Sequence, residues 1–108
     1  MMFDYARFRE LLAEREQIHS EWEAGLADYY ERMSSFVAEN ITDSIAFLSY
    51  ECTADEFVWL SEVFDDIARK TQSRAFIDCL YAVVRKFPEE DQKYNLTHHI
   101  EDAESWLD

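Results

Sequence analysis

The sequence predicts an all-α fold, and three observations carry that prediction. Only one glycine and one proline occur among 108 residues, too few for the tight turns of a sheet protein of this size. Long stretches are rich in Ala, Leu, Glu, Arg and Phe, which favour helices. The apolar fraction of 48%, with 16% aromatic residues, is sufficient for a buried core. We therefore expect one acidic helical domain over residues 1–108, with five or six helices.

The first third of the chain has apolar residues at spacings of three, four or seven, as on one stripe of a helix. These residues are Phe8, Leu11, Ile18, Trp22, Leu26, Tyr29, Met33 and Phe36. A polar break centred on Ser20, with that serine as N-cap, predicts helices near 4–17 and 21–39. One continuous long helix is the alternative. A short helix then begins at Asn40 or Thr42.

The middle of the chain carries two helix-start signals. Thr53 and Glu56 have the spacing of a capping box, which predicts a helix from Ala54 to about Arg69. Ser73 is the expected cap of the next helix, over 74–87. Apolar residues nearly encircle that second helix, which is typical of a central core element.

The last quarter of the chain contains the only proline. Pro88 is expected to end the preceding helix, because the residue before a proline disfavours helical geometry. A polar loop over Glu89–Lys93 is expected next, followed by a helix capped by Asn95 or Thr97. The buried stripe of that helix consists of Leu96, Ile100, Ala103 and Leu107. A compact antiparallel bundle and a stacked array of helix hairpins both fit this pattern.

The charge of the chain is its most informative bulk property. Twenty-four acids against ten Lys and Arg residues give a net charge of −14, whereas solubility requires a magnitude of only roughly 2–8. Both halves share the excess, with ten acids and four bases in residues 1–50 and fourteen and six in 51–108. Such a field repels nucleic acid and anionic membranes and attracts basic proteins. A merely well-solvated surface is the alternative.

The expected compartment is the cytoplasm. No apolar run suited to a signal peptide occurs at the N-terminus, and no stretch has the length and apolarity of a transmembrane helix. Cys52 and Cys79 are expected to be reduced core thiols, without a disulfide between them.

Motifs for catalysis or metal binding are not evident in the sequence. Adjacent His98 and His99 point about 100° apart on a helix and do not converge on one ion. Glu16 and His19 match one half of a di-iron bundle motif, but the second half is missing. Cys79 falls on the helix expected to be most buried, where a thiol is normally inert. We therefore expect no catalytic residues, no metal and no cofactor, and a protein that is not an enzyme.

The candidate binding site is the polar side of the helix predicted over 54–69. Asp55, Val58, Trp59, Glu62 and Asp66 fall within about 100° of helix arc. A tryptophan ringed by carboxylates suits a surface of Lys and Arg, through charge and cation–π contact. The alternative is that another helix covers Trp59 and makes it an ordinary core residue.

A second acidic stripe lies on the last helix and includes Glu101, Glu104 and Asp108. Such stripes are usually only solvated faces. Glu101 and Glu104 are nevertheless the next candidate contact residues, after Asp55, Trp59, Glu62 and Asp66.

Three segments of the second half of the chain carry a family resemblance. Residues Phe57–Phe64, Lys70–Ser73 and Phe76–Leu80 together resemble small helical immunity proteins of bacterial contact-dependent growth inhibition and related polymorphic toxin systems. The resemblance implies a cytosolic antidote that binds the C-terminal toxin domain of a cognate effector and blocks its active site. Many such toxins are nucleases, often ribonucleases, with basic clefts.

The sequence therefore leads us to expect an immunity protein that neutralises a nuclease toxin, with a ribonuclease as the first candidate. An acidic chaperone or adaptor for another basic protein is an alternative of the same class. A helical-bundle enzyme with a carboxylate metal site is an alternative of a different class, and a purely structural oligomer is a third.

Overall fold

The all-α prediction is confirmed by the computed structural model of the chain, which describes residues 4–19 and 21–108 and has no strand among them. The described residues form eight α-helices and one short 3₁₀ turn, η1. In chain order they are α1 (Tyr5–Gln17), α2 (Glu23–Glu39), α3 (Ile41–Tyr50), α4 (Ala54–Leu60), η1 (Ser61–Val63), α5 (Phe64–Thr71), α6 (Arg74–Val84), α7 (Pro88–Tyr94) and α8 (Leu96–Glu104).

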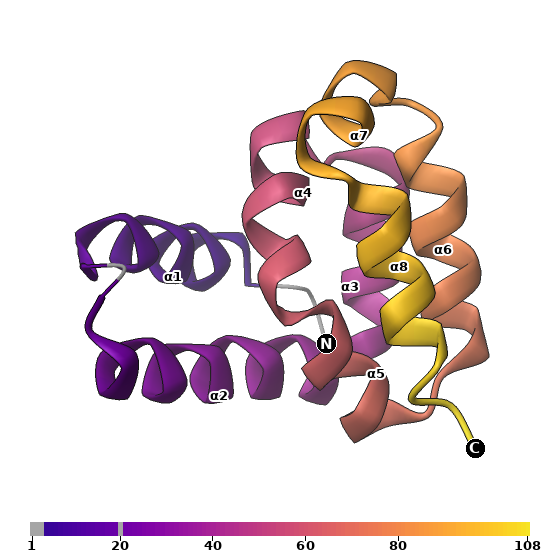
Figure 1. Cartoon of the computed structure of the whole chain (residues 1–108). Helices are drawn as coiled ribbons and strands as arrows, with labels where there is room; N and C mark the ends of the chain where they lie inside the picture. The colour runs from indigo at the N-terminus through magenta and orange to yellow at the C-terminus, as the bar shows by residue number, and fades with distance from the viewer. Residues whose placement is uncertain (1–3, 20) are drawn as a thin grey trace.

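The helices are arranged in two parts, as Figure 1 shows. Helices α3, α4, α6 and α8 stand side by side and alternate up and down, while the short helices α5 and α7 make corners at opposite ends. Helices α1 and α2 form an antiparallel hairpin that lies across this bundle (Figure 1). The bundle part fits the first of the two expected architectures.

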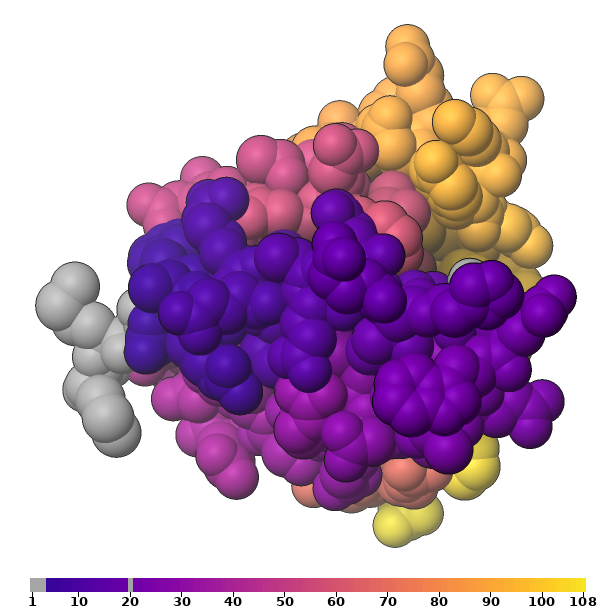
Figure 2. Space-filling view, turned by 90° about the vertical axis from the view of Figure 1, so that its left-hand side faces the viewer, coloured from indigo at the N-terminus to yellow at the C-terminus, as the bar shows by residue number. Residues whose placement is uncertain are grey.

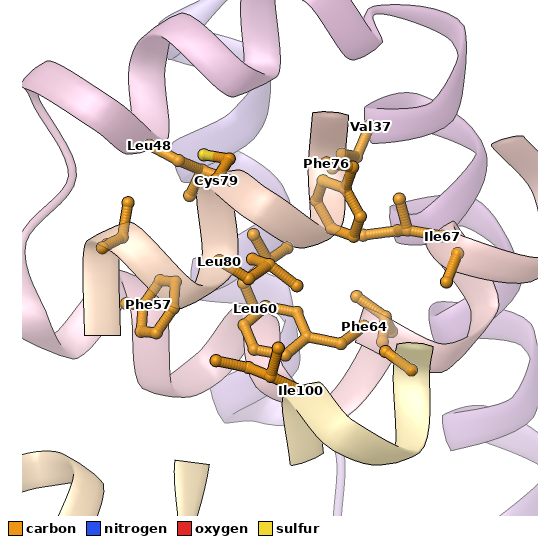
Figure 3. Close-up of a cluster of buried hydrophobic side chains, with 14 of the residues drawn as sticks. Val37, Leu48, Phe57, Leu60, Phe64, Ile67, Phe76, Cys79, Leu80 and Ile100 are labelled. Carbon is orange, nitrogen blue, oxygen red and sulfur yellow. The ribbon is translucent and has the colours of Figure 1, made fainter. Parts of the chain in front are cut away.

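The core is one continuous cluster of buried apolar side chains, to which every α-helix except α7 contributes. Figure 3 shows its centre, where Phe57, Phe64 and Leu80 meet Ile100. Helix α6 buries six of its eleven residues, which confirms that it is a central helix. Exclusion of these large side chains from water is the main force that holds the helices together.

Several helices begin where the predicted N-cap residues stand. The hydroxyl of Thr53 accepts from the Glu56 amide at 3.2 Å, and the Glu56 carboxylate accepts from the Thr53 amide at 2.9 Å, so the capping box is formed. Ser73 caps α6 by accepting from the Phe76 amide at 3.0 Å. Asn40 stands at the start of α3, although its side chain donates to the Phe36 carbonyl instead of capping.

The first two helices match the predicted pair, and the alternative of one continuous helix is wrong. Helix α1 ends at Gln17, and α2 begins at Glu23. The expected N-cap, Ser20, lies outside the described residues. Trp22 stands at the N-cap position of α2 without a side-chain cap.

The predicted helix 54–69 is interrupted, which corrects the expectation of one regular face. The 3₁₀ turn η1 separates α4 from α5 at Ser61–Val63. The Ser61 hydroxyl donates back to the carbonyl of Val58, a bond that competes with regular helix. Val63, with φ −118° and ψ 11°, lies outside helical geometry. Asp66 therefore does not continue the helical arc of Asp55 and Trp59.

The polar loop expected at Glu89–Lys93 is wrong, because Pro88–Tyr94 forms helix α7. Pro88 occupies the first helical position, where its missing N–H is not needed. Three acids follow in the first turn and favour the positive end of the helix. The preceding helix ends at Val84, earlier than predicted, and Leu107 lies beyond the end of α8.

Candidate functional site

The predicted contact residues Asp55, Trp59 and Glu62 lie around one surface hollow. Its volume is about 550 Å³, and we call it the Trp59 hollow. Helix α4 and η1 provide one wall, and α7 and α8 provide the other. The lining residues are Asp55, Val58, Trp59, Ser61 and Glu62 on the first wall and Tyr94 and His99 on the second. Figure 2 shows the surface hollowed between the pink α4 segment and the orange α7–α8 segment, beside the α1–α2 hairpin.

Trp59 is neither a fully exposed anchor nor an ordinary core residue. Its ring is half-buried and packs against the core. The guanidinium carbon of Arg15 lies 5.2 Å from the ring centroid, within cation–π range. Trp59 and Asp55 also line a smaller hollow of about 260 Å³ against α1. The ring therefore stands between α1 and the Trp59 hollow and is available for contact on the surface.

Glu62 is held in a network that joins three segments of the chain. Its two carboxylate oxygens accept from Nε and Nη2 of Arg15 at 2.8 and 3.1 Å. The Tyr30 hydroxyl donates to the same carboxylate at 3.0 Å. The bond to Glu62 raises the pKa of Arg15, and burial with the nearby Glu62 charge raises the pKa of Tyr30. Glu62 thus fixes the α1–α2 hairpin to η1 and shapes the floor of the site.

The other three predicted residues lie elsewhere. Asp66 pairs with Arg69 at 2.8 Å on the surface of α5. Glu101 is exposed on α8, and Glu104 accepts from Tyr81 and from Arg74 of α6. None of the three lines the Trp59 hollow.

Internal ion pairs occupy most of the basic side chains and leave acids unpaired. Seven of the ten Lys and Arg residues, all within the described parts of the chain, pair with carboxylates: Arg7, Arg9, Arg15, Arg32, Arg69, Lys70 and Arg74. Asp55, by contrast, is exposed and has no bonded partner among the described residues. Among the described residues, carboxylates without an ion-pair partner therefore outnumber the three bases without one, and one of these bases, Lys93, lies beside Tyr94 of the hollow.

A second group of carboxylates lies on α5 and α8. Partial burial raises the pKa of Asp65, and the charges of Asp102 and Asp66 raise it further, while His99 opposes the shift. A cation bound nearby would relieve the mutual repulsion of these carboxylates.

The serine of the hollow and the two cysteines of the chain have hydroxyl and thiol groups whose state the structure describes. The Ser61 hydroxyl is used by the Val58 carbonyl. Burial raises the pKa of Cys52 to about 12 and also raises the pKa of Cys79, so both thiols stay protonated at neutral pH. The two cysteines are free, as expected. Among the described residues, no three His, Cys, Asp or Glu side chains are grouped to hold a metal ion.

Three lining residues were not predicted from the sequence: Ser61 on η1, and Tyr94 and His99 on the second wall. Tyr94 is the last residue of α7, the segment expected to be a loop, and His99 lies on α8. Their approach to Trp59 depends on the packing of α7 and α8 against α4 and η1. No periodicity within one helix signals such a contact.

Comparison with known proteins gave no match, either to family models, to curated proteins or to solved structures. Within the described residues, no helix combines the length and apolarity that a membrane crossing requires.

Proposed function

We propose that this protein is a cytoplasmic immunity protein that binds a nuclease toxin, in the first place a ribonuclease, and covers its basic active-site cleft. It acts without a cofactor or metal, binds neither nucleic acid nor membrane, and is not an enzyme. The observation that carries the proposal is the Trp59 hollow, an aromatic depression with a free carboxylate on a surface whose bases are mostly paired internally.

The electrostatics support an inhibitor of this kind. A nuclease cleft is positive because it binds phosphate, so an acidic protein that fills the cleft competes directly with the substrate. Long-range attraction between opposite charges raises association rates toward about 10⁸–10⁹ M⁻¹s⁻¹ at low salt. Fast capture suits an antidote, because free toxin damages the cell that contains it. The resemblance of residues 57–80 to immunity proteins supports the same function.

The experiment starts from the gene directly upstream, because an antidote gene is expected to follow its toxin gene. The C-terminal domain of that gene's product is expressed with and without this protein. We expect the domain alone to stop growth and to degrade RNA, co-expression to restore growth, and the purified pair to form a complex. An upstream product that is harmless and yet bound would favour the adaptor alternative. An upstream product that is neither toxic nor bound would overturn the proposal.

Charge-reversed variants test the location of the interface. Asp55→Lys/Asp65→Lys reverses one acid that lines the hollow and one on α5. Asp43→Lys/Glu51→Lys makes the same change in net charge on and next to α3. We expect the first pair to weaken toxin binding at least about 100-fold, as unfavourable charges at an interface do. The second pair should lower only the association rate. Equal effects of the two pairs would place the interface elsewhere. Glu62→Lys is unsuitable, because Glu62 binds Arg15 inside the fold.

A further inference from the structure

The walls of the Trp59 hollow combine apolar surface, aromatic rings and negative charge. Val58 and Trp59 form one side, Tyr94 lies opposite, and Asp55 supplies a carboxylate without a bonded partner in the described structure. The volume of about 550 Å³ exceeds that of any single side chain. We propose that this hollow receives an arginine side chain of the partner. The inference deepens the proposed function, since it rests on the partner being a basic protein.

The protein already shows how such a side chain is held at Trp59. The guanidinium of Arg15 lies over the indole ring at 5.2 Å and forms two bonds to Glu62. Stacking on an aromatic face together with a carboxylate acceptor is the arrangement that suits a planar guanidinium. The hollow offers the same pair of features to an incoming group. Trp59 and Tyr94 provide aromatic surface, and Asp55 provides the acceptor.

The charge balance around the hollow favours a cation over a neutral ligand. Glu62 is already neutralised by Arg15, whereas Asp55 is not paired. Asp65 on α5 and Asp102 on α8 add to the negative charge of this half of the molecule. Lys93, which lies 5.1 Å from the Tyr94 ring, is a cation that opposes this field. An apolar ligand would cover Asp55 without offering a bond, which carries a desolvation penalty.

Arginine fits the hollow better than lysine does. Its guanidinium is flat, weakly hydrated and able to stack on an aromatic ring while it donates to a carboxylate. The ammonium of lysine is strongly hydrated and loses more when Trp59, Val58 and Tyr94 exclude water from it. The methylene groups of either side chain would pack against the apolar part of the wall.

The test uses a small probe and needs no toxin. N-acetyl-arginine amide is titrated into the ¹⁵N-labelled protein, and the indole N–H signal of Trp59 is followed, assigned by its loss in Trp59→Phe. We expect a saturable shift with a dissociation constant on the order of 1 mM, as for a ligand of this size. N-acetyl-citrulline amide has the same shape without the charge and should bind at least about tenfold more weakly. Equal shifts with both probes, or no saturable shift with arginine, would overturn the inference.

Two single substitutions are expected to change the affinity for arginine in opposite directions. A general loss of folding would lower the affinity in both and so could not explain this result. Asp55→Asn should weaken arginine binding by about threefold to tenfold, since it removes one partly exposed charge partner. Lys93→Gln should strengthen it by about twofold, because a competing cation is removed. Asp43→Asn on α3 is the matched control and should leave it unchanged. A failure of Asp55→Asn to weaken binding would contradict the assigned acceptor.

The outcomes separate this inference from the proposed function. Arginine binding at Trp59 without neutralisation of any toxin would retain the pocket and reject the antidote. Neutralisation of a toxin without arginine binding would retain the antidote and reject the pocket. In a complex, replacement of the inserted toxin arginine by lysine should weaken binding by about tenfold or more.

Discussion

Where α5, α6 and α8 meet, the interface is apolar and fully buried. The residues that these helices contribute have no exposed surface: Phe64, Ile67, Ala68, Phe76, Ile77, Leu80, Leu96, Ile100 and Ala103 are all 0% exposed. The seam between the α1–α2 hairpin and the rest of the molecule also has apolar contacts, but ionised groups run through it. Arg15 bonds to Glu62 across that seam, and Arg9 lies 2.8 Å from Glu56.

The apolar interface and the ion-paired seam differ in how their stability depends on pH and salt. Apolar burial depends little on pH or moderate salt, whereas ion pairs weaken when salt screens them or when a carboxylate is protonated. The Trp59 hollow lies beside the ion-paired seam, because Glu62 belongs to both. The proposed binding surface is therefore attached to an apolar core on one side and to the ion-paired hairpin on the other.

The largest expected effect comes from a cavity in the apolar region. Phe64→Ala should lower the free energy of unfolding by about 3–5 kcal/mol, since the ring is fully buried. Urea denaturation at low and high NaCl measures it, and the loss should be the same at both salt concentrations. Phe64→Leu, with an expected loss below about 1.5 kcal/mol, keeps the test open if the alanine variant does not fold. Tyr50→Ala is the control, because Tyr50 is 86% exposed.

The second effect comes from the seam. Glu62→Gln leaves Arg15, which is 9% exposed, without its counter-charge and should cost about 2–3 kcal/mol. Arg15→Met in the same background should recover part of this loss, because no buried charge is then left unpaired. Urea denaturation of both single variants and the double variant gives the coupling, expected at about 1–2 kcal/mol. Strictly additive losses would show that the pair does not hold the hairpin.

The same contrast explains what the sequence could predict. The caps at Thr53 and Ser73 depend on residues three apart, and the apolar surround of α6 is local, so these features were predicted correctly. The partner of Glu62 is 47 residues away in the sequence, and no local pattern indicates it. Glu62 was therefore predicted as a free contact residue, and the structure places it in an internal network.

Two features of the fold that were predicted wrongly, helix α7 and the break at η1, do have local signals in the sequence. Pro88 followed by three acids is the start signature of a helix, although the segment was predicted as a loop. Ser61 within an apolar run is able to bond back to the preceding turn and interrupt it. The position of Tyr94 on the same hollow as Trp59 had no such signal, because it depends on how whole helices pack.

A smaller effect tests how the hairpin begins its second helix. A Cβ at Gly25 would overlap Cε3 of Trp22, so the glycine admits the indole ring against α2. Gly25→Ala in a Trp22→Ala background should stabilise the protein by about 0.5–1 kcal/mol through helix propensity. In the wild-type background the displaced ring should cancel that gain. Ala27→Gly on the exposed side of α2 is the control and should cost about 1 kcal/mol in both backgrounds. Equal gains in both backgrounds would show that the ring does not need the glycine.

The smallest effect is the pH dependence of an ion pair inside the hairpin. Arg32 of α2 bonds to Glu14 of α1, with one of the two bonds at 2.9 Å, and holds the pKa of Glu14 below its ordinary value of 4.5. A carboxylate with a lowered pKa in the folded state stabilises the fold fully above its unfolded pKa, and this contribution is lost as the pH falls through the folded value. Glu14→Gln should therefore cost about 0.5 kcal/mol at pH 7, a value suited to a partly exposed pair, and nothing by about pH 2.

Urea denaturation of the wild type and of Glu14→Gln at a series of pH values measures this difference. Glu16→Gln removes a neighbouring exposed acid without a bonded cation among the described residues, so its effect should not decline with acid in the same way. The loss caused by Phe64→Ala should stay constant over the same range, since no ionised group lies in that contact. A Glu14→Gln difference that persists in acid would mean that the pair contributes through packing, and the contrast between the ion-paired hairpin and the apolar core would then be weaker than the charges indicate.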